Sequence, residues 1–145
     1  FEKPEATNLA KMRDSSGEIW HRMGDLGYLE SQGRLWFCGR KSHRVVLENE
    51  TLFTIPCEGI FNTHQAVYRT ALVGAKVKGQ TIPVICVEKE PTTKIEWKTL
   101  ESDLKNLAQQ YPQTRSIQNF LLHPKFPVDI RHNAKIFREK LAVWA

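Results

Sequence analysis

The stretch that decides the fold is Ala66–Glu90, which reads "AVYRTALVGAKVKGQTIPVICVEKE". Two runs rich in valine, isoleucine and other apolar residues lie on either side of Lys78–Gln80, a short segment that contains a glycine. Such runs around a glycine-containing turn are typical of two paired antiparallel strands. Pro83 lies inside the second run. Because proline has no N–H to donate, it predicts a sheet edge or a bulge at that point.

The segments that follow this hairpin predict a helix, a strand and a second helix. Residues 93–111 are expected to form an amphipathic helix, because apolar residues recur there at helical spacing: Ile95, Leu100, Leu104 and Leu107. Residues 116–123 read as a short strand. A proline-bounded basic loop then leads into a final amphipathic run, whose apolar residues share one face: Phe137, Leu141 and Trp144.

The segments that precede the hairpin add a helix and further strands. Residues 56–64 begin with a proline, which suits the first turn of a helix. Residues 44–48 read as a short strand, and residues 18–40 as a β-hairpin around the turn "SQG". We therefore expect an α+β fold, with a short β-hairpin and an antiparallel or mixed central sheet flanked by helices.

Positive charge gathers toward the end of the sequence. The net charge of the 145-residue chain is +5. Residues 1–50 contribute nothing to it, residues 51–124 contribute two charges, and residues 125–145 contribute three. Clustered cations indicate a solvated face, an anionic ligand or nucleic acid. Nucleic acid is the weaker interpretation, because no binding motif is present and no aromatic residues alternate with these cations.

Composition excludes several other classes of protein and site. No apolar run approaches the roughly 18 residues of a membrane-spanning helix. Cys38, Cys57 and Cys86 are widely spaced in apolar surroundings, which is typical of buried, reduced thiols in a cytoplasmic protein. No cysteines or histidines have the spacing of metal ligands, so no metal site is expected.

A second stretch carries the evidence on function. His21–Val45, "HRMGDLGYLESQGRLWFCGRKSHRV", follows the pattern "TGDLGYLDEDGRLWFVGRKDDRI" at many positions in order. This pattern is a signature of the adenylate-forming enzymes, which include acyl-CoA synthetases, peptide-synthetase adenylation domains and luciferases. Ile55–Gly74 and Arg131–Leu141 resemble later segments of the same family. The chain therefore resembles the C-terminal part of such an enzyme. Met23–Val45 and Phe126–Ala145 also resemble the branch that makes β-lactones in olefin biosynthesis, often labelled fatty acyl-CoA ligase.

The resemblance implies roles for individual residues. Asp25 matches the aspartate that binds the ribose hydroxyls of ATP, and Arg40 matches an arginine close to the nucleotide. Lys135 matches the lysine that contacts the substrate carboxylate and the α-phosphate, where it stabilises the transition state of adenylation. We expect Lys135 at the beginning of the last helix. If Asn133 caps that helix, the amides of the first turn add to the anion site.

The resemblance also implies a division of the chain. Residues 1–40 match the end of a large N-terminal domain that binds ATP and the acyl group, and residues 41–145 match a small, mobile C-terminal lid domain that carries the catalytic lysine. Lys41 and Ser42 fall at the hinge between them. Three further residues are candidate accessory groups: Arg131, His132 and Tyr28.

The implied activity is that of an ATP-dependent, AMP-forming ligase that adenylates a fatty acid or a β-hydroxy fatty acid. ATP and Mg²⁺ are the expected cofactors, with the Mg²⁺ ligands outside this sequence. The expected partners are the acid substrate, the N-terminal domain of the same enzyme and other lipid-pathway enzymes, but neither nucleic acid nor a membrane. Residues 1–145 alone should be inactive.

The use of CoA is an open question. Family members that use CoA commonly carry a lysine after the hinge and then a Gly-x-Arg turn, but this chain has Val46 and Thr51–Phe53 there. These bulkier, apolar residues speak against thioester formation. The second step would then be closure of a β-hydroxyacyl adenylate by its own hydroxyl, which proximity favours. A non-enzymatic module that binds an anion or nucleic acid through its basic C-terminal face stays as the alternative.

Overall fold

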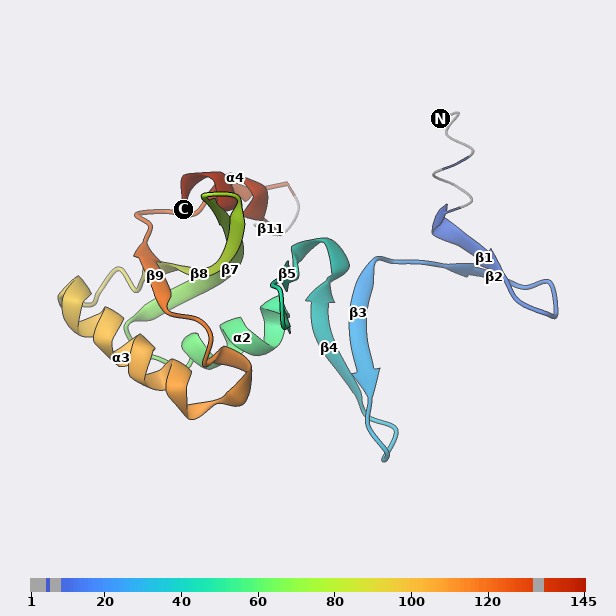
Figure 1. The fold of residues 1–145 in the computed structure, drawn as a ribbon, viewed down its shortest axis with the longest axis horizontal. Coiled ribbons are helices and arrows are strands. Elements are labelled where there is room, and N and C mark those ends of the chain that lie inside the picture. Colours follow the sequence, from blue (N-terminus) through green and yellow to red (C-terminus); the bar gives the residue numbers. More distant parts are fainter. Residues whose placement is uncertain (1–4, 6–8, 132–134) are drawn as a thin grey trace. The chain divides into compact units, whose positions relative to one another are not determined.

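The computed structural model describes residue 5, residues 9–131 and residues 135–145 (Figure 1). These residues form two compact units, residues 1–42 and residues 43–145. The first unit contains four strands: β1 Lys11–Arg13, β2 Ile19–His21, β3 Asp25–Leu29 and β4 Leu35–Arg40. The short 3-10 helix η1, Lys41–His43, spans the boundary between the units. The second unit contains the remaining elements: β5 Val45–Val46, β6 Thr51–Leu52, α2 Thr54–Phe61, β7 Val67–Val77, β8 Gln80–Lys89, α3 Trp97–Gln110, η2 Pro112–Thr114, β9 Asn119–Leu122, β10 Val128–Asp129, β11 Lys135–Ile136 and α4 Arg138–Trp144.

The first unit consists of two antiparallel pairs, β1 with β2 and β3 with β4. The turn between β3 and β4 is closed by a hydrogen bond from the Glu30 N–H to the Arg34 carbonyl oxygen at 3.0 Å. This confirms the predicted hairpin for residues 25–40. The prediction is wrong for residues 19–21, which pair with Lys11–Arg13 instead. Trp36 and Phe37 on β4 remain 48% and 51% exposed, an apolar surface of the kind that packs against further protein.

The second unit is built on a mixed sheet with the strand order β7-β8-β9. β7 and β8 are antiparallel, as their sequence predicts, and the two-residue turn places Lys78 and Gly79 at positive φ (49° and 84°). β9 runs parallel to β8, and α3 forms the crossover between them.

The edge position predicted from Pro83 is wrong, because β8 is the central strand of the sheet. Pro83 lies opposite Gly74 on β7, and the pairing with β9 begins only at Val84. The proline therefore lies just before the part of β8 that pairs with β9, and its carbonyl oxygen accepts a hydrogen bond from the Asn119 Nδ2 at 3.2 Å. Because β9 does not pair with β8 at this position, the N–H that proline lacks would have had no backbone partner in the sheet.

Alternation along β7 and β8 buries both faces of the sheet. One core lies between the sheet and the helices α2 and α3, and its members include Phe61, Leu72, Ile85, Leu100 and Leu104, which are fully buried. The other core lies between the opposite face and α4, and it includes Ala71, Val73, Cys86, Phe126 and Leu141. Helices thus cover both faces of the central sheet, which confirms the predicted α+β class. The three cysteines are buried free thiols, also as predicted.

The last helix begins later than the sequence indicated. α4 starts at Arg138 with Phe137 as its N-cap, and no side chain caps it. Lys135 instead lies in β11, because Lys135 and Ile136 pair with Asp129 and Val128 of β10. The expectation that Lys135 opens the helix is therefore wrong. Asn133, which was expected to cap it, lies outside the described residues.

No helix among the described residues has the length and apolar character needed to cross a membrane.

Candidate functional site

The two residues predicted to bind the nucleotide lie side by side at one end of the β3–β4 hairpin. Asp25 and Arg40 are direct register partners, although they lie 15 positions apart in the chain. The Arg40 Nε lies 3.1 Å from the Asp25 Oδ1, and the Arg40 Nη1 donates to the Met23 carbonyl oxygen at 2.5 Å. The Arg40 side chain is 48% exposed and the Asp25 side chain 37%. A carboxylate and a guanidinium in this arrangement can both still reach a ligand.

The predicted hinge begins next to this pair. Gly24 has a φ of 75°, which glycine adopts without steric cost. Its carbonyl oxygen accepts a hydrogen bond from the Lys41 N–H at 2.8 Å. Lys41 and Ser42 are the first two residues of η1, and the compact units divide directly after Ser42.

Tyr28 lies on the same hairpin but is occupied by a packing contact. Its ring stacks on Trp36, the residue opposite it in the register, with centroids 6.4 Å apart and an interplanar angle of 16°. The Tyr28 side chain is 57% exposed. The structure thus gives this candidate accessory residue a cross-strand partner.

Lys135 is held by a very short strand with its side chain exposed. Its register partner in β10 is Asp129, which accepts a hydrogen bond from the Arg131 N–H at 3.0 Å and lies 3.5 Å from the Arg131 Nε. Within the part of the chain that the structure describes, no hydrogen bond or ion pair engages the Lys135 ammonium group. His132 lies outside the described residues. Lys135 belongs to residues 43–145, whereas Asp25 and Arg40 belong to residues 1–42, so these three residues are not brought together within one unit.

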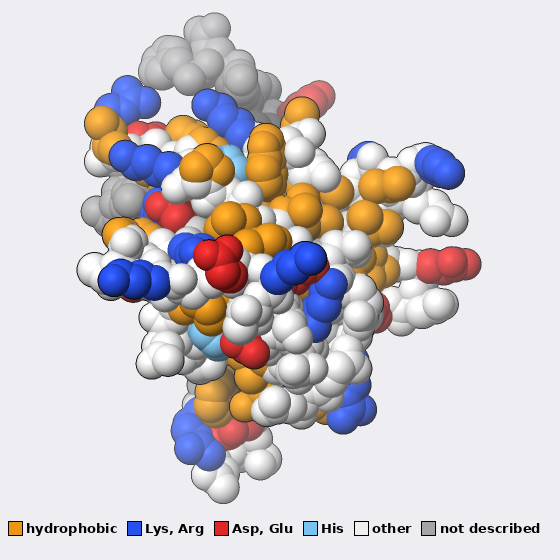
Figure 2. All heavy atoms as spheres, turned by 90° about the vertical axis from the view of Figure 1, so that its left-hand side faces the viewer, with side chains coloured by type: hydrophobic (Ala, Val, Ile, Leu, Met, Phe, Trp, Pro, Cys, Tyr) orange, Lys and Arg blue, Asp and Glu red, His pale blue; other side chains and the backbone are white. Residues whose placement is uncertain are grey.

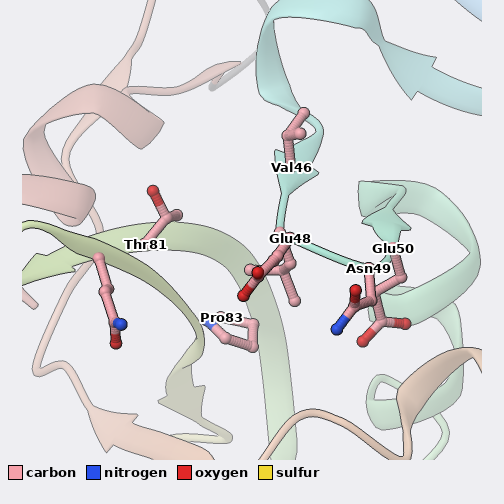
Figure 3. Close-up of a pocket in the computed structure, with 8 residues that line it drawn as sticks. Val46, Glu48, Asn49, Glu50, Thr81 and Pro83 are labelled. Carbon is pink, nitrogen blue, oxygen red and sulfur yellow. The ribbon is translucent and has the colours of Figure 1, made fainter.

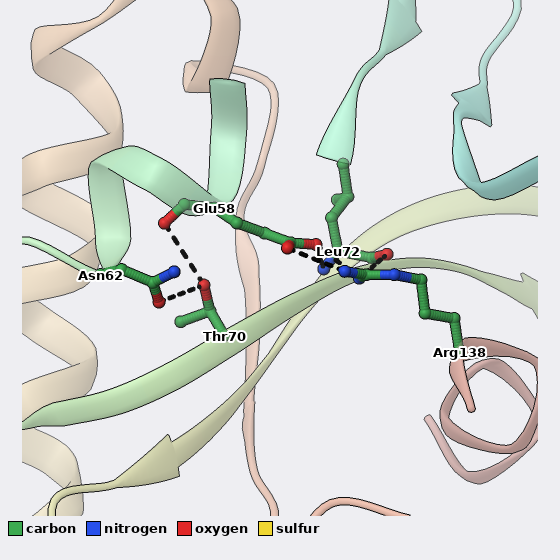
Figure 4. A network of polar contacts seen from close by, with 5 residues as sticks. All are labelled: Glu58, Asn62, Thr70, Leu72 and Arg138. Carbon is green, nitrogen blue, oxygen red and sulfur yellow. Dashed lines mark hydrogen bonds and ion pairs between the residues drawn. The ribbon is translucent and has the colours of Figure 1, made fainter. Parts of the chain in front are cut away.

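The structure also contains a buried ion pair that the sequence did not reveal (Figure 4). Glu58 on α2 and Arg138 on α4 form two contacts, Nη1–Oε1 at 2.5 Å and Nη2–Oε2 at 2.9 Å. The Glu58 Oε1 also accepts the Leu72 N–H at 2.7 Å, and the Leu72 carbonyl oxygen accepts the Arg138 Nη1 at 3.4 Å. The only hint in the sequence was a carboxylate within the apolar run "PCEGIF", since a separation of 80 residues carries no periodic signal.

Opposing influences act on the Glu58 carboxyl group. Burial raises its pKa, whereas the Arg138 guanidinium and the Leu72 N–H oppose that rise. Both side chains are nearly excluded from solvent, with 8% of Glu58 and 14% of Arg138 exposed. The pair is therefore a fixed structural contact between α2, β7 and α4.

The segment that departs from the CoA-using pattern forms a tight hairpin of β5 and β6 (Figure 3). Leu52 of this hairpin is buried in the core, and the Leu47 N–H closes the turn on the Glu50 carbonyl oxygen at 2.9 Å. The tip lines a groove of about 450 Å³ between the hairpin and β8, and Glu48, Glu50 and Thr81 are among its lining residues. The rim of this groove is therefore acidic.

The visible face carries mixed charge, and the described residues hold no metal-binding cluster. On the face shown in Figure 2, lysine and arginine side chains lie among acidic ones instead of forming one continuous basic surface. Across the parts of the chain described here, no group of three or more His, Cys, Asp and Glu side chains could hold a metal ion. The residues that the structure describes thus do not fit a Mg²⁺ site.

Comparisons with known proteins place these features in context. No protein-family model matches the chain. An olefin beta-lactone synthetase from Xanthomonas campestris pv. campestris is 50% identical over the whole chain, which spans 27% of that relative. The anthranilate CoA ligase AuaEII, solved with anthranoyl-AMP, has the same fold, with a TM-score of 0.79 and 18% identity over 97% of this chain and 26% of that one. The o-succinylbenzoate coenzyme A synthetase MenE from Bacillus subtilis, solved with ATP and a magnesium ion, gives a TM-score of 0.73 at 22% identity, over 97% of this chain and 27% of that one. The chain thus spans about a quarter of the length of the proteins it matches.

Proposed function

Because the chain belongs to the adenylate-forming enzymes, we propose that it is the C-terminal part of an ATP-dependent, AMP-forming synthetase that converts a β-hydroxy fatty acid into a β-lactone. The observation that carries this proposal is the 50% identity, over the whole chain, to an olefin beta-lactone synthetase. In this proposal residues 1–40 complete a large N-terminal domain, and residues 41–145 form the mobile lid. The division of compact units after Ser42 and the short helix at Lys41–His43 support this arrangement.

In the first step a carboxylate oxygen of the acid attacks the α-phosphorus of ATP, and pyrophosphate leaves with the bridging oxygen. Asp25 accepts hydrogen bonds from the ribose hydroxyls, for which its two oxygens are suited. Its ion pair with Arg40 supports this role, because the guanidinium orients the carboxylate. The Lys135 ammonium stabilises the charge that gathers on the phosphoryl oxygens in the transition state.

Magnesium accompanies ATP in one of the related structures. The described residues do not fit a site for it. We therefore place its ligands outside this chain and assign it no role through these residues.

In the second step the β-hydroxyl oxygen attacks the acyl carbon of the adenylate. The bond from that carbon to the AMP oxygen breaks, AMP leaves, and the hydroxyl proton is released. The hairpin of β5 and β6 supports a step without CoA, because Glu48 and Glu50 at its tip disfavour a ligand that carries several phosphates. The competing function, acyl-CoA ligation, is favoured by the fold shared with CoA ligases.

Product analysis of the full-length enzyme separates these two functions. Release of AMP from ATP and a β-hydroxy fatty acid, with formation of the lactone in the absence of CoA, is the expected result. Turnover that requires CoA and yields a thioester would contradict the proposal.

A lysine variant tests the first step. Lys135→Ala should lower acid-dependent pyrophosphate exchange by about 10²- to 10³-fold, the usual loss on removal of one transition-state stabiliser. Lys98→Ala is the matched control, because Lys98 is also an exposed lysine and lies on α3. Unchanged exchange in a folded Lys135→Ala enzyme would exclude the proposed role. The isolated chain should bind a mononucleotide more weakly than the whole enzyme does. It should also show no steeply salt-dependent affinity for oligonucleotides. Such an affinity, if it were found, would favour the basic-module alternative.

A further inference from the structure

Lys135 needs a defined position to act in the proposed first step, yet β11 has only two residues. An exposed lysine on so short an element depends on the segments on either side of it for its placement. The contacts of those segments fix the place of Lys135, and their importance rests on its proposed role.

The first anchor lies on the N-terminal side. Phe126 is 2% exposed, and its N–H donates to the Glu88 Oε2 on β8 at 3.0 Å. From there the chain runs into β10, where Val128 pairs with Ile136. The Phe137 N–H donates to the Pro127 carbonyl oxygen at 2.9 Å. The β10–β11 pair is thereby fixed to the central sheet through its first strand.

The second anchor lies on the C-terminal side, three residues after Lys135. The Arg138 guanidinium meets the Glu58 carboxylate with two nitrogens, at 2.5 Å and 2.9 Å. Such a bidentate contact fixes the orientation of the arginine as well as its distance, which a single ion pair does not. Three residues span at most about 11 Å of extended chain, so any movement of Arg138 is transmitted to Lys135.

The second anchor also binds the backbone at the edge of the sheet. β7 is an edge strand of the three-stranded sheet, and Leu72 turns its backbone groups away from β8. The Leu72 N–H donates to Glu58 at 2.7 Å, and its carbonyl oxygen accepts from Arg138 at 3.4 Å. Glu58 and Arg138 therefore join α2, on one face of the sheet, to α4, on the other, around an edge whose polar groups they satisfy.

From this geometry we propose that Glu58 and Arg138 are positioning residues for Lys135. Their buried pair sets the register of α4 against β7 and α2. Through Phe137 and Ile136 it also sets the place at which the Lys135 ammonium is presented. Neither residue contacts the reacting atoms, and both act through the lysine.

The test uses two conservative variants of the full-length enzyme. Glu58→Gln keeps the shape of the side chain but removes its charge. Arg138→Lys keeps the charge but removes the bidentate contact that the guanidinium makes. Each should lower kcat for acid-dependent pyrophosphate exchange by about 10- to 100-fold, since a displacement of about 1 Å at a catalytic group costs that much. The KM for ATP should change little, because Asp25 and Arg40 belong to the other compact unit.

A second readout distinguishes positioning from general damage. AMP release from a β-hydroxyacyl adenylate supplied ready-made should stay at the parent rate, because no role is assigned to Lys135 in that step. Glu101→Gln is the matched control, since it removes an exposed ion pair with Lys105 on α3 and should leave both rates unchanged.

Three outcomes would overturn the inference. They are a parent rate of exchange in both folded variants, an equal loss in exchange and in AMP release, or failure of both variants to fold, which would make the pair purely structural. Lys135→Ala, measured in parallel, separates this inference from the proposed function. If Lys135→Ala loses exchange while the Glu58 and Arg138 variants do not, only the positioning role fails.

Discussion

The glycine at position 27 offers a sharp test of how the β3–β4 hairpin presents Asp25 and Arg40. A Cβ atom added to Gly27 would lie 2.7 Å from the backbone carbonyl oxygen of Trp36 on the facing strand. Carbon atoms normally stay about 3.3 Å or more from such an oxygen, so Gly27→Ala must separate the strands by roughly 0.6 Å. Because the obstacle is backbone, no side-chain rotation can relieve the overlap.

The expected cost is about 1–3 kcal/mol, the range for overpacking at a site that cannot relax freely. This cost falls on the hairpin, so its amides should exchange about 5- to 150-fold faster, since each 1.4 kcal/mol is about tenfold. The Lys41 N–H, which donates to the Gly24 carbonyl oxygen at 2.8 Å, is the most informative amide. The KM for ATP should rise as well, because Asp25 and Arg40 pair across the strands that are forced apart.

Hydrogen exchange of the full-length enzyme, followed by mass spectrometry, measures the local effect. Gly59→Ala is the control, because Gly59 lies inside α2, has no atom within 4 Å of an added Cβ and has no positive φ. That substitution should stabilise α2 by about 0.5–1 kcal/mol. Exchange of the β3–β4 amides at the parent rate in Gly27→Ala would refute the reasoning.

Two further predictions concern titratable groups. Burial raises the pKa of the Cys57 and Cys86 thiols to about 12, so their thiolates are scarce near neutral pH. Iodoacetamide at pH 8 should alkylate them only after denaturant is added, and rapid labelling of the native protein would contradict their burial. In the β1–β2 hairpin, hydrogen bonds from Ser16 and Trp20 lower the pKa of the Asp14 carboxyl from its ordinary 3.8 to about 2. Because the folded value lies below the ordinary one, Asp14 supports the hairpin fully above about pH 4, and that support is lost as the pH falls through 2. An NMR titration should show this transition, and Asp14→Asn should abolish it.

Much of the fold follows from local patterns that the sequence displays directly. The valine-rich runs around Lys78 and Gly79 predicted the hairpin of β7 and β8, and the helical spacing of Leu100 and Leu104 predicted α3. Both are confirmed, because turn chemistry and amphipathic period act over a few residues and need no distant partner. Asp25 and Arg40 were instead identified through the resemblance to the adenylate-forming motif, and they prove to be register partners.

Other features needed the folded chain. Pro83 signalled an edge, yet it lies on the central strand, because the extent of β9 decides which groups of β8 require partners. Lys135 was expected at a helix start, but pairing with β10 holds it in a strand. Strand pairing depends on two segments, so the sequence of one strand does not predict how far its partner extends along it.

Helix period, turn residues and a dense motif are properties of neighbouring positions, so they predicted α3, the β7–β8 hairpin and the resemblance to adenylate-forming enzymes without reference to the fold. By contrast, the contact of Glu58 with Arg138, 80 residues apart, at the edge of β7 was found only in the folded chain. The reason is that a charge becomes stable in the interior only through a partner and satisfied hydrogen bonds, and these come from segments that folding alone brings together.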